Sequence, residues 1–405
     1  MSRTAPTRHL ATQAASQPAN RLATRLVLGF GLLAGIALSG PAQAGKKPFS
    51  YFVTGDATAA VQTLAPAAPS LVLMGGGPDV DEAFRWMITR AGVRPGTGGR
   101  FVVIRATGTE AYDPYIFHSD ANGSTTGPAI DGWVGGAALG LSSVETLVVP
   151  SLAAANDPGV SEVLAKANAV FIAGGDQADY IKSWKGTALD RTLQQLMARN
   201  VPVGGTSAGL AVLGQFDFAA LRGTVTTDQT LSNPYNRYVT LDPSPLALTG
   251  GFIAPPALAG TITDSHLDTR DRMGRLIGFM SRLVQPSPSS AGSFGCAGGV
   301  LPATQVRGIG IGVETAVLVE GQGNAAPYSY TARRVTNVST TTESAAYFLR
   351  TLQAPTACAS GQPLTVLSVE VRKLADDTVF NLSDWTGLPA YHVDAISGAL
   401  TSNPY

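Results

Sequence analysis

The sequence has few charged side chains and no excess of either sign. Of its 405 residues 14% are charged, and 28 Lys and Arg balance 28 Asp and Glu, so the formal net charge is zero. A protein that binds nucleic acid or an anionic membrane surface normally carries a basic excess or a concentrated basic patch. We therefore expect neither partner. Because 44% of the residues are hydrophobic, the chain should fold into a globular protein with a large core.

Long hydrophobic runs are scarce as well. The most apolar segment extends from Leu26 to Leu38, about 13 residues, whereas a transmembrane helix needs roughly 20. Two arginines precede this segment and an Ala-x-Ala pattern ends at Ala44, an arrangement typical of a secretory signal peptide. We expect residues 1–44 to be such a peptide, and the mature protein to be periplasmic or extracellular and not bound to a membrane. An uncleaved membrane anchor is the alternative.

Cysteine occurs only twice, as Cys296 and Cys358, and neither has neighbours spaced as metal ligands. In an exported protein the pair is compatible with one disulfide, and two free thiols are the alternative. We expect no metal and no organic cofactor.

Apolar runs alternate with amphipathic helical patterns through the first half of the mature chain. Four runs have the length and composition of buried strands: 70–74, 101–106, 144–150 and 169–175. Together they predict an α/β fold, with a mainly parallel sheet covered by helices on both faces. We expect this domain to span residues 45–324. A small β-rich addition should follow at 325–405, where apolar alternation recurs at 364–371.

Glycine is abundant, at 46 residues, and several predicted strands are followed by glycine-rich turns. One of these, "VPVGGTSAGLAVLG" at 201–214, places Ser207 in a Gly-x-Ser-x-Gly pattern at a predicted strand-to-helix junction. Such a match arises easily by chance in a chain with this much glycine. Another, "MGGGPD" at 74–79, fits neither a phosphate-binding loop nor a dinucleotide-binding fingerprint.

A serine nucleophile needs a base, usually a histidine, and histidine is scarce here. Beyond the predicted signal peptide only His118, His266 and His392 remain. His118 lies in polar loop sequence, which favours an ordinary surface position. His392 lies near the end of the chain, where an α/β-hydrolase would place its base, and His266 follows a predicted strand. On residue patterns alone, His266 and His392 both stay open.

Charged residues surround His266 in the segment "DSHLDTRDRMGRL". On an extended strand Asp264 and His266 would point to the same side, and a cluster of arginines would suit a substrate that bears carboxylates. The alternative is a solvated helix, from about residue 270 to 283, with ordinary i,i+4 ion pairs. Those pairs would be Asp268 with Arg272 and Asp271 with Arg275.

Acyl transfer also needs donors for the oxyanion, commonly backbone N–H groups. Ala208 follows the serine and would supply one donor. The turn after the predicted strand 169–175 would supply another, from Gly175 or Asp176. A plain strand-to-helix turn is the alternative, since a double glycine is weak support by itself.

Four linked segments resemble the cyanophycinase-like serine peptidases, the S51 group that includes dipeptidase E. They are "AGGDQADYI" at 173–181, "GGTSAG" at 204–209, "DSHLDTRDRMGRL" at 264–276 and "GIGVETAVLV" at 310–319. The resemblance extends over about residues 50–320. It implies a fold like that of the class I glutamine amidotransferases.

The resemblance implies a role for each matching residue. Ser207 matches the nucleophile and His266 its base, which favours His266 over the other histidines. Gly175 and Ala208 would donate to the oxyanion, beside an active-site glutamine matched by Gln177. The positions that match the substrate site are Asp264, Arg270, Arg272 and Arg275.

The third member of the triad is open between two carboxylates. Glu314 matches the family glutamate and is preferred, and Asp264 is a reasonable substitute, because orienting an imidazole requires only a positioned carboxylate. The chain also departs from the family pattern. Leu267 replaces an aromatic residue, Val313 replaces an acidic one, and a linker with Cys296 lengthens the path from the base to Glu314.

Cyanophycinases, as a family, hydrolyse cyanophycin, which is multi-L-arginyl-poly-L-aspartate, to β-Asp-Arg dipeptides. The resemblance implies an exported serine peptidase that forms an acyl-enzyme on Ser207 and has cyanophycin or peptides as its partners. A secreted exopeptidase for other acidic or isoaspartyl peptides is the alternative. A catalytically silent binding protein, and an α/β-hydrolase that would use His392, are less favoured. A homodimer is compatible with the sequence.

Overall fold

The computed structural model describes residues 47–405 as one compact unit, apart from 121–122, 124–131, 244–250, 290–291 and 341–343. The predicted signal peptide and its cleavage site lie outside the described residues. Within the described part of the chain, no helix has the length and apolar character needed to cross a membrane.

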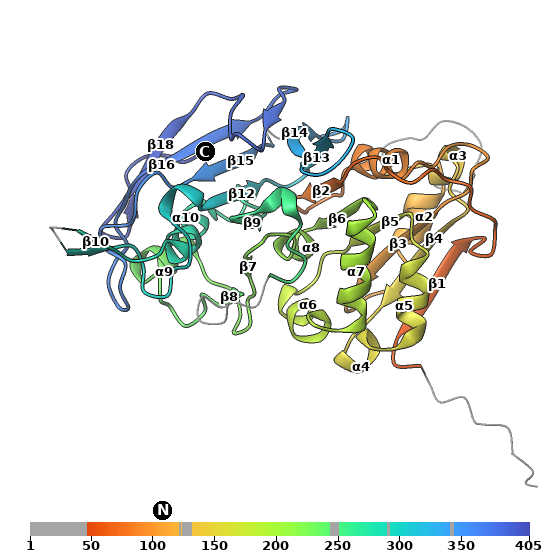
Figure 1. Ribbon diagram of the computed structural model, residues 1–405, viewed down its shortest axis with the longest axis horizontal. Helices are drawn as coiled ribbons and strands as arrows, with labels where there is room; N and C mark the ends of the chain where they lie inside the picture. Colours follow the sequence, from red (N-terminus) through yellow and green to blue (C-terminus); the bar gives the residue numbers. More distant parts are fainter. Residues whose placement is uncertain (1–46, 121–122, 124–131, 244–250, 290–291, 341–343) are drawn as a thin grey trace, which may run out of the picture. The chain divides into compact units, whose positions relative to one another are not determined.

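A nine-stranded sheet forms the centre of this unit (Figure 1). Its strands, in spatial order, are β1 (Ser50–Gly55), β4 (Ser143–Val148), β3 (Arg100–Arg105), β5 (Ala169–Ile172), β6 (Val203–Thr206), β2 (Ser70–Met74), β13 (Ala316–Gln322), β14 (Ser329–Val335) and β17 (Phe380–Asn381). The strands from β4 to β2 are parallel, whereas β1 on one side and β13, β14 and β17 on the other are antiparallel. The expected parallel sheet is therefore the middle of a mixed one.

The predicted strands at 70–74, 101–106, 144–150 and 169–175 are confirmed within two or three residues, and helices cover both faces of the sheet, as expected. On β2 the side chains of Leu71 and Leu73 join a core with α7, whereas Val72 and Met74 join a core with α1. The helices are α1 (Asp81–Arg90), α2 (Tyr112–Phe117), α3 (Gly136–Leu139), α4 (Leu152–Ala155), α5 (Pro158–Ala165), α6 (Gln177–Trp184), α7 (Ala188–Ala198), α8 (Ala208–Ala211), α9 (Thr227–Ser232) and α10 (Met273–Leu283).

A second, six-stranded sheet contains most of the C-terminal region. Its order is β19 (Ala399–Leu400), β18 (Tyr391–Ile396), β16 (Val366–Leu374), β15 (Ala346–Arg350), β12 (Arg307–Ile311) and β9 (Thr261–Ser265). Residues 325–405 are built from strands, as their alternation predicts, but these strands join both sheets: β14 and β17 extend the first, and β15 pairs with β12 in the second. The boundary at 324/325 stays a prediction.

Two short strand pairs complete the fold. They are β7 (Asp217–Phe218) with β8 (Leu241–Asp242), and β10 (Ser287–Ser289) with β11 (Gly292–Phe294). The segment after β11 carries Cys296, which is buried and bonded to Cys358, with their Cα atoms 5.1 Å apart. The disulfide considered from the sequence is therefore confirmed. It ties this segment to the C-terminal region across 62 residues of chain.

We expect the disulfide to stabilise the protein, because a cross-link over a long loop restricts the unfolded chain. Replacing both Cys296 and Cys358 with Ser should lower the free energy of unfolding by about 2–4 kcal/mol, measured by urea denaturation. As a control, reductant should lower the midpoint of the wild type and leave that of the double variant unchanged. Equal midpoints for oxidised wild type and variant would contradict this expectation.

Candidate active site

Ser207 lies at a sharp turn between β6 and α8. Its backbone has φ +54° and ψ −111°, a conformation that a residue with a side chain rarely adopts and that costs of order 1–3 kcal/mol. The turn is held by the hydrogen bond from the Ala211 N–H to the Ser207 carbonyl, at 3.0 Å. The strand, turn and helix predicted around Ser207 are therefore confirmed.

The two glycines that flank Ser207 are required by close backbone approach. A Cβ atom at Gly205 would lie 2.5 Å from the backbone of Gly209, and one at Gly209 would lie 2.0 Å from the Ile172 carbonyl oxygen. Neither distance is compatible with a side chain. The Gly-x-Ser-x-Gly pattern is thus a structural requirement of this turn rather than a product of glycine abundance.

The last residue of β2 and the two that follow it, together called the loop 74–76, hold the backbones of all three predicted catalytic residues. Three consecutive carbonyl groups of this loop each accept a hydrogen bond from the backbone N–H of one of them. The pairs are Met74 with Ser207 at 3.1 Å, Gly75 with His266 at 2.8 Å, and Gly76 with Glu314 at 2.9 Å. All three donors have positive φ, at 54°, 49° and 54° in that order.

Gly76 also makes room for the imidazole of His266. A Cβ atom at Gly76 would lie 2.3 Å from Cε1 and 2.7 Å from Nε2 of the ring, and Gly76 itself has φ +96°. The sequence analysis assigned "MGGGPD" no role in placing the predicted base. The signal that could have pointed to this role is the run of three glycines directly after a buried strand.

His266 is poised as a neutral base. Burial, together with the positive charges of Arg270 and Arg272, lowers the pKa of His266 from 6.5 to about 4, while Asp264 and Asp268 oppose the shift. Its Nδ1 atom lies 3.3 Å from the Ser265 hydroxyl. At neutral pH the ring can therefore accept a proton.

Neither predicted partner of the ring is hydrogen-bonded to it in the described structure. Among the described residues, the Ser207 hydroxyl and the Glu314 carboxylate make no hydrogen bond with the His266 ring. Only the backbones of the three residues are brought together, by their hydrogen bonds to the loop 74–76. Catalytic hydrogen bonds are often long or poorly aligned without substrate. The catalytic roles of these three residues therefore stay predictions.

Asp264 is committed to an arginine rather than to the histidine. Its carboxylate is buried and accepts two hydrogen bonds of 2.7 Å from Arg275, one at each oxygen. Arg272 approaches the same carboxylate at 3.6 Å. Asp264 makes no hydrogen bond with the imidazole among the described residues, and the choice between Asp264 and Glu314 as the third member stays a prediction.

The helix-surface alternative for the arginines is wrong. The helix begins at Met273, not near residue 270, because Asp271 has φ +43° and breaks the helical path. Arg275 pairs with Asp264 instead of Asp271, and its guanidinium lies beside the rings of Phe218 and Phe279, 5.2 and 5.7 Å from their centroids. The i,i+4 ion pairs considered from the sequence do not form among the described residues.

A cavity of about 290 Å³ brings the predicted oxyanion and substrate residues together. Gln177 lies at its rim at the start of α6 and donates a hydrogen bond of 3.3 Å to the Phe218 carbonyl. His266 and Glu314 are not among the described residues that line the cavity. The predicted site residues that do line it are Gly175, Gln177, Ser207, Ala208, Asp264, Arg270, Arg272 and Arg275.

The sequence also matches a known family over the centre of this site. The model of peptidase family S51 matches residues 137–239, which include the Gly175 turn and Ser207. Over this segment the chain is similar to peptidase family S51.

Known proteins are similar to this chain over part of its length. A cyanophycinase of Geminocystis herdmanii is 28% identical over 144 residues, which are 35% of this chain and 47% of that protein. The chain thus spans about half the length of this curated relative. The crystal structure of a peptidase from an acI-B1 Actinobacterium is similar over 83% of this chain and 97% of that one, with 14% identity and a TM-score of 0.38. At that score the likeness carries no argument.

The other two described histidines lie on elements other than those that form the Ser207 turn. His118 directly follows α2, and His392 is exposed on β18, where it lies opposite Glu370 of β16. Unlike His266, neither makes a backbone hydrogen bond to residues 74–76, where Ser207 is also bound, among the described residues. The structure therefore offers no support for His392 as the base of an α/β-hydrolase.

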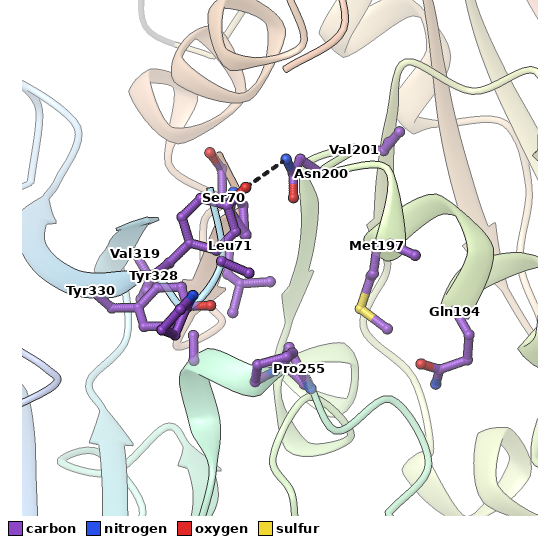
Figure 2. A pocket seen from close by; sticks show the side chains of 16 residues that line it. Ser70, Leu71, Gln194, Met197, Asn200, Val201, Pro255, Val319, Tyr328 and Tyr330 are labelled. Carbon is purple, nitrogen blue, oxygen red and sulfur yellow. Dashed lines mark hydrogen bonds between the residues drawn. The ribbon is translucent and has the colours of Figure 1, made fainter. Parts of the chain in front are cut away.

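A larger cavity, of about 560 Å³, lies at the opposite end of β2 (Figure 2). It is lined mainly by apolar side chains, with Ser70 and Leu71 at the start of the strand, and Asn200 donates a hydrogen bond of 3.4 Å to the Tyr328 hydroxyl there. None of the predicted site residues lines it. Cavity size alone would have misplaced the site.

We expect the His266 imidazole to titrate with a midpoint near pH 4. Arg270→Gln should raise this midpoint, because it removes one of the positive charges that lower the pKa, whereas Arg270→Lys keeps the charge and should change it less. NMR of the Cε1–H group measures the midpoint, with His266→Asn identifying the signal. A wild-type midpoint near 6.5 would show that neither burial nor the arginines act on this ring.

We expect Gly76→Ala to displace the imidazole of His266, because the new methyl group would overlap the ring. Labelling of Ser207 by a fluorophosphonate should slow at least about tenfold, since the serine loses its base. Gly96→Ala is the matched control, because Gly96 has φ +87° with nothing within 4 Å, so it adds backbone strain without a clash. Equal labelling rates for the two variants would contradict a role of Gly76 in placing the ring.

Proposed function

We propose that this protein is a serine peptidase of family S51 that forms an acyl-enzyme on Ser207. The observation that carries the proposal is the loop 74–76, whose three consecutive carbonyls bind the backbones of Ser207, His266 and Glu314. Acyl transfer needs a nucleophile, a base and a carboxylate, and residues of these three types come together here from distant parts of the chain. They meet at one glycine-rich loop, and each has a strained backbone conformation. A silent binding protein has no chemical need for that arrangement.

The proposed reaction is that of a serine nucleophile with a histidine base. The Ser207 hydroxyl oxygen attacks the scissile carbonyl carbon and its proton passes to the neutral imidazole of His266. The N–H groups of Gly175 and Ala208, which line the cavity beside Ser207, donate to the oxyanion. Collapse of the tetrahedral intermediate sends the proton from the imidazolium to the leaving amine, and water then releases the acyl group by the same route.

Substrate binding would strengthen this base. A pKa of about 4 makes His266 neutral but weakly basic, and the charges of Arg270 and Arg272 contribute to that low value. A substrate carboxylate that pairs with these arginines would offset their field and raise the pKa of the imidazole. The base would then become strongest when the substrate is in place.

The charges of the cavity favour an acidic substrate. Arg275 is neutralised by Asp264, but Arg270 has no ion pair among the described residues, and Arg272 donates to the Ser265 carbonyl at 2.8 Å and lies 3.6 Å from the shared Asp264. Arginine binds carboxylates strongly and in a fixed geometry. We propose cyanophycin as the substrate, because each of its arginyl branches carries a free α-carboxylate that can pair with these arginines, and β-Asp-Arg dipeptides as the products. The cyanophycinase relative supports this choice. Other acidic or isoaspartyl peptides are the second candidate.

We also propose that the protein acts outside the cytoplasm, after cleavage near Ala44. The disulfide between Cys296 and Cys358 supports this, because such bonds persist mainly in oxidising compartments.

Incubation of the purified protein with cyanophycin, and with a panel of acidic, isoaspartyl and ester substrates, tests the proposal. Ser207→Ala and His266→Ala should each lower kcat by at least about 10³-fold, because each removes a participant in the same proton transfer. His392→Ala is the matched control and should retain the wild-type rate. Cleavage is followed by chromatography of the released dipeptides.

The outcomes separate the candidates. Cleavage of the small peptides without cleavage of the polymer would move the substrate to the second candidate. Loss of activity in His392→Ala but not in His266→Ala would show that the base is His392 and not His266. A folded wild type that turns over none of the substrates would overturn the proposed activity.

A further inference from the structure

The hydroxyl group of Tyr405 reaches the loop that carries the arginines of the cavity. It accepts a hydrogen bond of 3.1 Å from the Met273 N–H. It lies 2.9 Å from the Leu267 carbonyl oxygen and 3.1 Å from Oδ1 of Asp271, and can donate its single proton to either one. One hydroxyl group therefore contacts three residues of this loop.

These three contacts alternate with the residues of the site. Leu267 directly follows His266, Asp271 lies between the two arginines at 270 and 272, and Met273 follows the second of them and begins α10. Any movement of the loop that displaced the arginines would also break a contact with Tyr405.

The loop needs such a restraint because its own conformation is unfavourable. Both His266 and Asp271 have positive φ, at 49° and 43°. In addition, burial lowers the pKa of Arg272 to about 10, and the positive charges of Arg275 and Arg270 lower it as well, against the opposing charge of Asp264. Strain and like charge would both be relieved if the loop opened.

Tyr405 is itself held firmly by the C-terminal strands. The hydroxyl of Tyr391, on β18, donates a hydrogen bond of 2.7 Å to the carbonyl of Pro404. The ring of Tyr405 stands edge-on to the ring of Tyr347, on β15, with centroids 5.8 Å apart. Tyr405 is therefore tied to the same sheet that contains β9, the strand before His266.

We propose that Tyr405 is a positioning residue, whose hydroxyl fixes the loop 267–273 and thereby places Arg270 and Arg272 at the cavity. The β-rich C-terminal region, which lies beyond the segment that resembles the family, then completes the substrate site. The effect on turnover rests on the proposed function, but the restraint on the loop does not.

The experiment compares the wild type with Tyr405→Phe, which keeps the ring and removes only the hydroxyl. Hydrogen exchange of the amides in 267–273 needs no substrate, and exchange at Met273 should be about tenfold faster in the variant, since its hydrogen bond is lost. With the substrate that the wild type cleaves, KM should rise about five- to thirtyfold and kcat should stay within about twofold. A merely structural role would not separate KM from kcat in this way.

Two further variants serve as controls. Tyr328→Phe removes a hydroxyl at the opposite end of β2 and should leave both exchange in 267–273 and KM unchanged. Tyr391→Phe loosens the Pro404 anchor while keeping the Tyr405 hydroxyl, and should give a smaller change in the same direction. If Tyr405→Phe folds poorly, exchange and KM in Tyr391→Phe still test the proposal.

The results that would overturn the proposal are distinct from failure of the proposed function. Exchange in 267–273 that is unchanged in Tyr405→Phe would remove the restraint itself. Faster exchange with an unchanged KM, or a fall in kcat alone, would show that the restraint does not place the arginines for substrate. A wild type that cleaves nothing would overturn the proposed function, and the exchange measurement would still decide whether Tyr405 restrains the loop.

Discussion

The whole site depends on three backbone hydrogen bonds to one short loop. The carbonyls of residues 74–76 accept from Ser207, His266 and Glu314, which come from three separate stretches of the chain. Each of these donors has positive φ, so each is held in a conformation that it would leave if the restraint were lost. Hydrogen bonds to a buried loop supply that restraint at the backbone, which leaves the three side chains free for chemistry.

Close approach of neighbouring atoms explains why residues 75 and 76 of this loop are glycines. A Cβ atom at Gly75 would lie 1.8 Å from the Gly312 carbonyl oxygen, and one at Gly76 would overlap the imidazole. The same rule governs the serine turn, where Gly205 and Gly209 bring β6, α8 and the end of β5 into contact. Glycine at these positions is a steric requirement, and the positive φ of Gly76 adds to it at one of them.

The sequence predicted the local features well and the long-range ones poorly. The buried strands, the turn at Ser207 and the segment before His266 follow from apolar runs and glycines within about ten residues. The choice of His266 needed the resemblance to a family, because no local pattern separates it from His392. The bidentate pair of Asp264 with Arg275, the helix start at Met273 and the contacts of Tyr405 depend on residues that are distant in sequence, so no periodicity reveals them.

The two sheets meet at this loop, which gives the C-terminal strands an indirect part in the site. β2 of the nine-stranded sheet leads into the loop, whereas β9 and β12 of the six-stranded sheet lead to His266 and Glu314. β12 lies between β9 and β15, and β15 is held by β16. The register of β9 and β12 against the loop therefore depends on strands beyond residue 345. If these strands were lost, the unpaired edge of β12 would be exposed and two of the three backbone hydrogen bonds would lose their support.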